Sequence, residues 1–272
     1  MAHAHRLHDY FSHGLQLAHT CTHCVGAVRC IQLDELFTTA RQAAHDLWLW
    51  VALDATTKFI PAFVLGPRTQ AMAHQLIHQV RQTLAAAHLP VFSSDGLNLY
   101  FYALTAHFGQ WLQAAGQATR VWCALPGLLY AQVQKIHRRR RLIRVNWKML
   151  CGSLEAFAAR LQALGLSGRI QTAFIERLNL TLRRSLAPLA RRSWSTAQLP
   201  GELYLHLEWW RAYYHFVRPH QALRQKLDQP RLRGGRRLAQ LFVARTPAMA
   251  VGFTQRPWSV LEVLSFPLPN HA

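Results

Sequence analysis

The chain has 272 residues, of which 51% are hydrophobic, so it can bury one large core or two small ones and is not a disordered chain. Its 31 Lys and Arg outnumber its 12 Asp and Glu, giving a formal net charge of +19 with neutral histidines. This excess favours a polyanionic partner, because the release of counterions from a phosphate backbone drives binding. A protein that is basic only for solubility is the alternative.

No part of the chain reaches the roughly 18 to 20 uninterrupted apolar residues of a membrane-spanning helix. The best candidate, LWLWVALDATTKFIPAFVLG, is interrupted by Asp54 and Lys58. The N-terminus has no apolar region before a cleavage site, so it does not resemble a signal peptide. The five cysteines are scattered and do not indicate a disulfide framework. We therefore expect a cytoplasmic protein with no membrane partner.

The first half of the chain predicts five strands and two helices. Apolar runs rich in β-branched and aromatic residues predict the strands, near 31–38, 47–54 and 58–65, in LPVFSS and in ATRVWCALP. Apolar residues at helical spacing predict the helices, over about 69–87 and in NLYFYALTAHFGQWL. The order βββαβαβ is typical of a mixed sheet flanked by helices.

A strongly basic segment, KIHRRRRLIRVNWKM, begins at residue 135. Its cationic residues are Lys135, Arg138, Arg139, Arg140, Arg141, Arg144 and Lys148. This density favours a surface for phosphates over an ordinary solvated face. We interpret residues 135–168 as a basic helical insertion, in which SLEAFAARLQALG forms a helix that ends at Gly165.

Three carboxylates stand in apolar or basic surroundings. Asp34 lies inside the first predicted strand, Asp95 at the end of LPVFSS, and Glu176 in the first turns of a later helix. Phosphodiester chemistry with two divalent ions about 3.5–4 Å apart needs such a group of acids, and Mg²⁺ or Mn²⁺ suits an all-oxygen site. On composition and spacing alone Glu35 and Asp54 have an equal claim, and Asp95 by itself fits a turn residue better.

Four segments form an ordered series: QLDELFT, SSDGLNLY, TAFIERLNLTLRRSL and WWRAYYHFVRPHQAL. They resemble the first aspartate strand, the second aspartate turn, the glutamate helix and the RPH segment of the DDE transposases of bacterial insertion sequences. The resemblance covers roughly residues 31–225. It implies an α/β, ribonuclease H-like fold with a mixed five-stranded sheet flanked by helices, and with extra helices inserted before the glutamate helix.

The resemblance assigns the catalytic triad to Asp34, Asp95 and Glu176, which would hold two Mg²⁺ or Mn²⁺ ions. It makes Asp54 a structural turn residue. Asn179 and Arg183 share the helix face of Glu176 and gain a part in positioning DNA or the carboxylate. The expected DNA contacts are Arg138, Arg139, Arg140, Arg141, Arg144, Lys148, Asn179, Arg183 and Arg184.

The N-terminal segment departs from the family pattern. Only 33 residues precede Asp34, whereas such transposases usually carry a DNA-binding domain there. HTCTHCVGAVRC contains a Cys-x-x-Cys pair, which is half of a structural zinc site. Its possible ligands are His19, Cys21, Cys24 and Cys30, with His23 beside them. A zinc site, a remnant of a truncated finger and unligated thiols all remain open.

The predicted organisation is a short segment over 1–30, a catalytic domain over 31–225 and a basic, proline-containing tail over 226–272. The predicted function is metal-dependent cleavage of DNA at transposon ends and strand transfer into target DNA, by a homo-oligomer that associates with the nucleoid. One alternative is an inactive or truncated element-derived DNA-binding protein. Another is a ribonuclease H-like nuclease that only hydrolyses.

Overall fold

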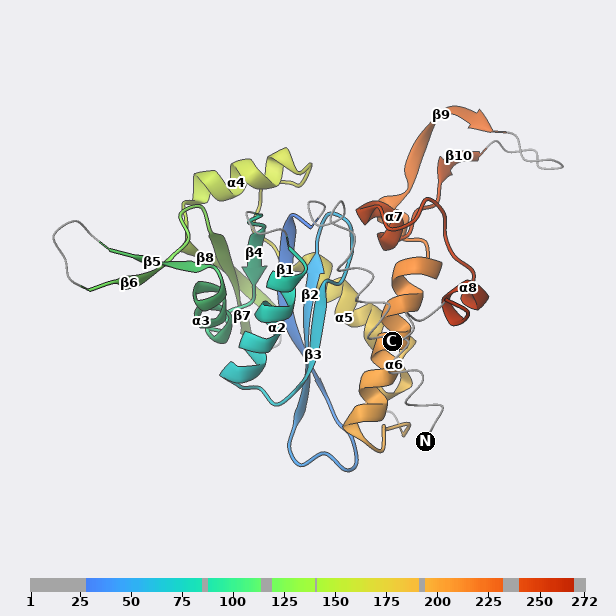
Figure 1. The fold of residues 1–272 in the computed structure, drawn as a ribbon, viewed down its shortest axis with the longest axis horizontal. Helices are drawn as coiled ribbons and strands as arrows, with labels where there is room; N and C mark the ends of the chain where they lie inside the picture. Colours follow the sequence, from blue (N-terminus) through green and yellow to red (C-terminus); the bar gives the residue numbers. More distant parts are fainter. Residues whose placement is uncertain are drawn as a thin grey trace, which may run out of the picture. The chain divides into compact units, whose positions relative to one another are not determined.

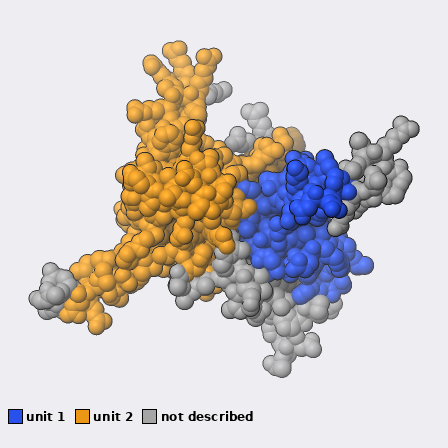
Figure 2. All heavy atoms as spheres, turned by 90° about the horizontal axis from the view of Figure 1, so that it is seen from above, with its two compact units in different colours: residues 1–27, 57–59, 204–272 blue, residues 28–56, 60–203 orange. Residues whose placement is uncertain are grey.

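The structure is a computed structural model that describes residues 28–84, 88–113, 119–139, 141–190, 194–231 and 240–266. The chain divides into two compact units, which are coloured separately in Figure 2. Unit 2 consists of Val28–Thr56 and Ile60–Leu203. Unit 1 contains Thr57–Phe59 and the described residues from Tyr204 onward. Within the described residues, no helix has the length and apolarity needed to cross a membrane.

A six-stranded mixed sheet forms the centre of unit 2 (Figure 1). Its strands are β1 (Cys30–Thr38), β2 (Leu47–Asp54), β3 (Ala62–Gly66), β4 (Val91–Ser94), β7 (Leu129–Arg138) and β8 (Arg141–Cys151). The order is β3-β2-β1-β4-β7-β8, in which β4 is parallel to β1 and β7, and the other neighbours are antiparallel. This mixed α/β arrangement fits the predicted ribonuclease H-like fold.

Helices cover both faces of the sheet (Figure 1). Two lie on one face, α2 (Gln70–Gln82) and α3 (Leu99–His107), and two on the other, α4 (Leu154–Ala163) and α5 (Ala173–Ser185). A short 3₁₀ turn over Ala187–Leu189 follows α5. The helix predicted over about 69–87 and the glutamate helix are thus both present, each with its apolar residues buried against the sheet.

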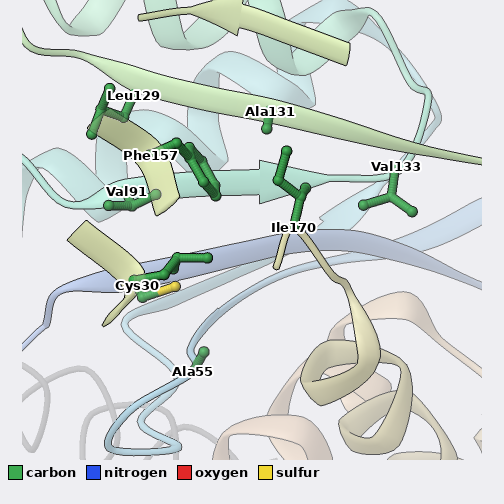
Figure 3. Packing of buried hydrophobic residues seen from close by; sticks show 9 residues of the cluster. Cys30, Ala55, Val91, Leu129, Ala131, Val133, Phe157 and Ile170 are labelled. Carbon is green, nitrogen blue, oxygen red and sulfur yellow. The ribbon is translucent and has the colours of Figure 1, made fainter. Parts of the chain in front are cut away.

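The core beneath α4 explains why β7 and β8 join the sheet (Figure 3). Val91 of β4, Ala131 and Val133 of β7 and Phe157 of α4 belong to one buried cluster, in which Phe157 lies beside Val91. Val145 and Met149 of β8 pack against the same cluster. Burying a large aliphatic side chain contributes about 1.5–3 kcal/mol to the stability of the fold. The apolar residues of β7 and β8 that pack against α4 therefore hold both strands in the sheet.

Two sequence expectations are wrong between β4 and α4. ATRVWCALP supplies β6 (Val121–Ala124), which pairs with β5 (Gly109–Leu112) in a separate two-stranded sheet; the fifth strand of the main sheet is β7, and β8 makes a sixth. The basic segment that we interpreted as helical continues β7 and returns as β8, so α4 is the only α-helix among the described residues of that insertion. Its apolar residues alternate with polar ones at period two, which favours a strand.

Unit 1 holds most of α6 (Pro200–Ala212), which begins in unit 2. The later elements are a π-helical turn over Tyr213–Val217, a 3₁₀ turn over Gln221–Leu223, β9 (Gln225–Arg231), β10 (Gln240–Val243), α7 (Pro247–Val251) and α8 (Val260–Leu264). Residues expected to form a tail therefore include two paired strands and two helices. The sheet-containing unit ends at Leu203, and the domain boundary at residue 225 stays a prediction.

Asp54 joins the end of β2 to the start of β1. Its Oδ1 accepts hydrogen bonds from the backbone N–H groups of Arg29 (2.9 Å) and Cys30 (2.8 Å), and its Oδ2 accepts one from the hydroxyl of Thr56. The side chain is fully buried. The structural turn role predicted for Asp54 is thereby confirmed.

Asp54→Ala should lower the free energy of unfolding by about 2–4 kcal/mol, because the buried N–H of Cys30 and the partly buried N–H of Arg29 would lose their acceptor. Urea unfolding followed by circular dichroism measures this change. Asp46→Ala, at an exposed position before β2, is the matched control and should change stability by less than about 0.5 kcal/mol. A loss below about 1 kcal/mol for Asp54→Ala would contradict the role of its carboxylate.

Candidate active site

Three carboxylates meet where β1 extends past the end of β4. The pairing of the two strands ends at Leu33 and Ser94. Asp34 and Glu35 continue β1 beyond that point, and Asp95 follows β4 directly. The ligand oxygens of Asp34, Glu35 and Asp95 all lie within 4.8 Å of one another. Successive side chains of a strand point to opposite faces, so β1 brings carboxylates from both faces to the end of β4.

Two donors fix the carboxylate of Asp34. The backbone N–H of Glu35 donates to Oδ1 (2.9 Å), and the side-chain amide of Asn179 on α5 donates to Oδ2 (2.7 Å). Asn179 is only 8% exposed. We expected Asn179 to position DNA or a carboxylate; its amide donates to Asp34 and orients that carboxylate, and a DNA contact stays a prediction.

Glu35 is held on the opposite face of β1. It forms an ion pair with Arg68, and the hydroxyl of Tyr100 on α3 donates to its Oε2 (3.0 Å). Its side chain is 3% exposed, whereas that of Arg68 is 42% exposed. Sequence reasoning set Glu35 aside, and no local pattern indicates its place beside Asp34, because consecutive residues of a strand point to opposite faces.

Gln32 of β1 holds the beginning of α5. Its Oε1 accepts a hydrogen bond from the backbone N–H of Ile175 (2.9 Å), and its Nε2 donates to the carbonyl of Gln171 (2.7 Å). The first N–H groups of a helix lack partners within the helix, so a buried amide at this point fixes where the helix starts. Gln32 therefore determines the position of Glu176, and sequence reasoning missed it.

Glu176 projects from the first turns of α5 toward β7. It forms an ion pair with Lys135, and the hydroxyl of Thr172 donates to the same oxygen, Oε1 (2.6 Å). Glu176 is not in the group of carboxylates within 4.8 Å. Its charge nevertheless contributes to raising the pKa values of Asp34 and Asp95, so all three predicted acids lie in one neighbourhood.

Burial and mutual repulsion disfavour the ionised forms of these acids. Burial, followed by the charges of Asp95 and Glu35, raises the pKa of Asp34 to about 7. Burial also raises the pKa values of Asp95 and Glu35, although the positive charge of Arg68 opposes both shifts. A divalent cation would remove this repulsion, because opposite charge favours the ionised carboxylate.

The donor set fits a hard divalent cation such as Mg²⁺ or Mn²⁺. Carboxylate oxygens are the ligands that these ions prefer, and Asp34, Glu35 and Asp95 supply them from two strands. The Oδ1 of Asn179 is buried and has no hydrogen-bond partner among the described residues. A water molecule bound to such an ion could satisfy this oxygen, as ordered water does for buried polar groups.

The predicted DNA contacts fall on two elements. The hairpin of β7 and β8 presents exposed basic side chains from Arg138, Arg139, Arg141, Arg144 and Lys148. Arg140 lies outside the described residues. On α5, Arg184 is exposed, whereas Arg183 donates a hydrogen bond to the carbonyl of Leu189 (3.3 Å). None of these arginines belongs to the carboxylate group.

Of the four possible zinc ligands, the structure describes Cys30 alone, so the zinc site stays a prediction. Cys30 is buried in the hydrophobic cluster of β1, next to Ala55 and Val91 (Figure 3), an environment typical of a structural thiol. His19, Cys21 and Cys24 lie outside the described residues.

A comparison with known families matches the part of the chain that contains Asp34, Glu35 and Asp95. Residues 27–110 match the model of the IS1 transposase family. The resemblance to an insertion-sequence DDE transposase is confirmed. The match includes Asp34, Glu35 and Asp95, ends before Glu176 and covers less than half of the chain. No curated protein matches the sequence. The match supports an enzyme of the transposase kind, which implies DNA as partner and a divalent metal ion as cofactor.

Gln32→Leu should lower the free energy of unfolding by about 1–3 kcal/mol, because the N–H of Ile175 would lose its acceptor and the carbonyl of Gln171 would keep only the longer bond from Ser93 (3.3 Å). The first turn of α5, which carries Glu176, should also exchange its amide hydrogens faster. Urea unfolding and hydrogen exchange measure the two effects. Gln42→Leu, an exposed position, is the control; unchanged exchange at the start of α5 would refute the role of Gln32.

Asp34→Asn should raise the free energy of unfolding of the metal-free chain at pH 8, by on the order of 2–4 kcal/mol. The folded-state pKa of Asp34, about 7, lies above its ordinary value of 3.8, so the ionised carboxylate opposes folding. Its destabilising effect grows as the pH rises from about 4 to 7 and is complete above that range. Urea unfolding in EDTA at pH 5 and pH 8 measures the difference.

Asp46→Asn removes an exposed charge outside the cluster and serves as the control for this pH series. It should show no stabilisation that increases with pH. A wild-type chain more stable than Asp34→Asn at pH 8 would mean that the carboxylate cluster does not strain the folded state.

Proposed function

We propose that the chain is a DDE transposase that cleaves DNA at transposon ends and transfers the freed strand into target DNA. Asp34, Asp95 and Glu176 are the catalytic residues of this proposal. The observation that carries it is the approach of Asp34 and Asp95 where the central strands β1 and β4 stop pairing, with Glu176 of α5 in the same neighbourhood. The net charge of +19 supports DNA as the substrate.

Asp34 and Asp95 would hold one divalent ion, and Asp34 and Glu176 a second. Bound there, the ions would activate water or a 3′-hydroxyl and stabilise the leaving 3′-oxygen. The chain's own contribution is orientation: Asn179 and the N–H of Glu35 fix the carboxylate of Asp34. Gln32 fixes the start of the helix that carries Glu176. Such preorganisation keeps the reacting groups in line, on which phosphoryl transfer depends.

The basic side chains of the β7–β8 hairpin would bind the DNA backbone next to this site. β7 passes Glu176 at Lys135 and continues to Arg138, and β8 returns with Arg141, Arg144 and Lys148. Phosphate contacts from such a two-stranded ribbon position a duplex without reading its sequence. By resemblance to transposases, two chains or more would bring two DNA ends together.

Glu176→Gln should reduce strand transfer by roughly 10³-fold or more, because the neutral amide binds a divalent ion poorly while it preserves size and the hydrogen bond from Thr172. DNA binding should stay within about threefold, since the basic surface is unchanged. The assay follows Mg²⁺-dependent cleavage and joining on a supercoiled plasmid that carries the sequences flanking the gene, beside a gel shift.

Glu155→Gln, an exposed acid at the start of α4, is the matched control and should retain both activities. Joining that survives in Glu176→Gln would reject the triad. Cleaved but never joined ends with the wild-type chain would favour a nuclease, and binding without any cleavage would favour an inactive DNA-binding relative.

A further inference from the structure

Two cations approach the acidic site from opposite faces of the sheet. Arg68 pairs with Glu35 on the face of α2 and α3, and Lys135 pairs with Glu176 on the face of α5. The two pairs differ in how firmly they are held. Both oxygens of Glu35 have donors and the carboxylate is almost fully buried, so its contact with Arg68 is part of the fold.

The pair of Lys135 and Glu176 is open to solvent and easily exchanged. The two side chains are 35% and 43% exposed. Exposed ion pairs contribute little to stability, because water and salt screen them and long side chains lose entropy. Lys135 and Thr172 both bond to Oε1, and neither bond uses Oε2 of Glu176.

The position of Lys135 on the hairpin separates it from the other cations there. Gln132 of β7 bonds to the carbonyl of Leu97 and pairs across the strands with Lys148, so both lie on the face of α3. Lys135 stands three residues after Gln132 in a regular stretch and therefore points to the other face, toward Glu176.

We propose that Lys135 is a positioning residue that neutralises Glu176 in the metal-free chain, leaves when a divalent ion binds, and then contacts a DNA phosphate. A divalent ion bound by Glu176 would repel the nearby ammonium group. The released side chain lies on the strand that leads to Arg138, where phosphates are expected. This inference rests on the proposed function, because it takes Glu176 as a metal ligand. It couples metal binding to DNA binding through one side chain.

Calorimetric titration of the metal-free chain with Mn²⁺ tests the first step. Lys135→Met should bind Mn²⁺ about fivefold more tightly than the wild type, because the competing cation is removed. Lys135→Arg retains the charge and should stay within about twofold of the wild type. Lys148→Met removes the same charge from the other face of the hairpin and should also stay within about twofold.

The salt dependence of DNA binding tests the second step, on a duplex of the flanking sequence with Ca²⁺ or with EDTA. With Ca²⁺, Lys135→Met should reduce the slope of log K against log salt by about one, because one phosphate contact is lost. With EDTA its slope should match the wild type, since Lys135 is then paired with Glu176. Lys148→Met should reduce the slope equally in both conditions.

Mn²⁺ binding by Lys135→Met that is no tighter than wild type, or a change of slope independent of Ca²⁺, would overturn the inference. Mn²⁺ binding by Glu176→Gln distinguishes a wrong role for Lys135 from a wrong assignment of Glu176 as a metal ligand. If Glu176→Gln weakens Mn²⁺ binding while Lys135→Met has no effect, the transposase proposal stands and the role of Lys135 is wrong. If Glu176→Gln leaves Mn²⁺ binding unchanged, Glu176 is not a metal ligand and both proposals fail.

Discussion

The parallel pairing of β1 with β4, which stops at Leu33 and Ser94, is the constraint on which the candidate site depends. Beyond that point Asp34 and Glu35 stay paired with β2 but no longer with β4, and Asp95 follows β4 directly. Asp34 and Glu35 both approach Asp95, although they are consecutive in a strand. The acidic site thus forms where β4 ends.

This arrangement concentrates negative charge in a strongly basic chain. The acids raise one another's pKa values, and the fold opposes this repulsion with Arg68 on one face and Lys135 on the other. Buried amides complete the support: Gln32 locates α5, and Asn179 orients Asp34. The polar groups around the carboxylates therefore do two tasks, since they stabilise the metal-free chain and preserve the geometry that a divalent cation requires.

β7 connects the hydrophobic core, the acidic site and the basic surface along one strand. Ala131 and Val133 are buried beneath α4, Lys135 meets Glu176, and Arg138 is exposed at the end of the strand. The paired strand β8 continues the exposed basic surface through Arg144 and Lys148. A strand that is packed at one end and solvated at the other gives the basic hairpin a rigid base, which a flexible basic loop would lack.

The sequence by itself determined the elements with clear periodicity, namely the first three strands, α2 and α5. The resemblance of its motifs assigned Asp34 to the first strand, Asp95 to the end of the strand LPVFSS and Glu176 to the glutamate helix. It misassigned the segment from residue 135, because a run of arginines concealed the period-two alternation of Val145 and Met149. Glu35, Gln32 and the buried role of Asn179 depended on contacts between residues distant in the chain. Only the tertiary structure decided these, because strand length, helix position and burial follow from packing that no local pattern records.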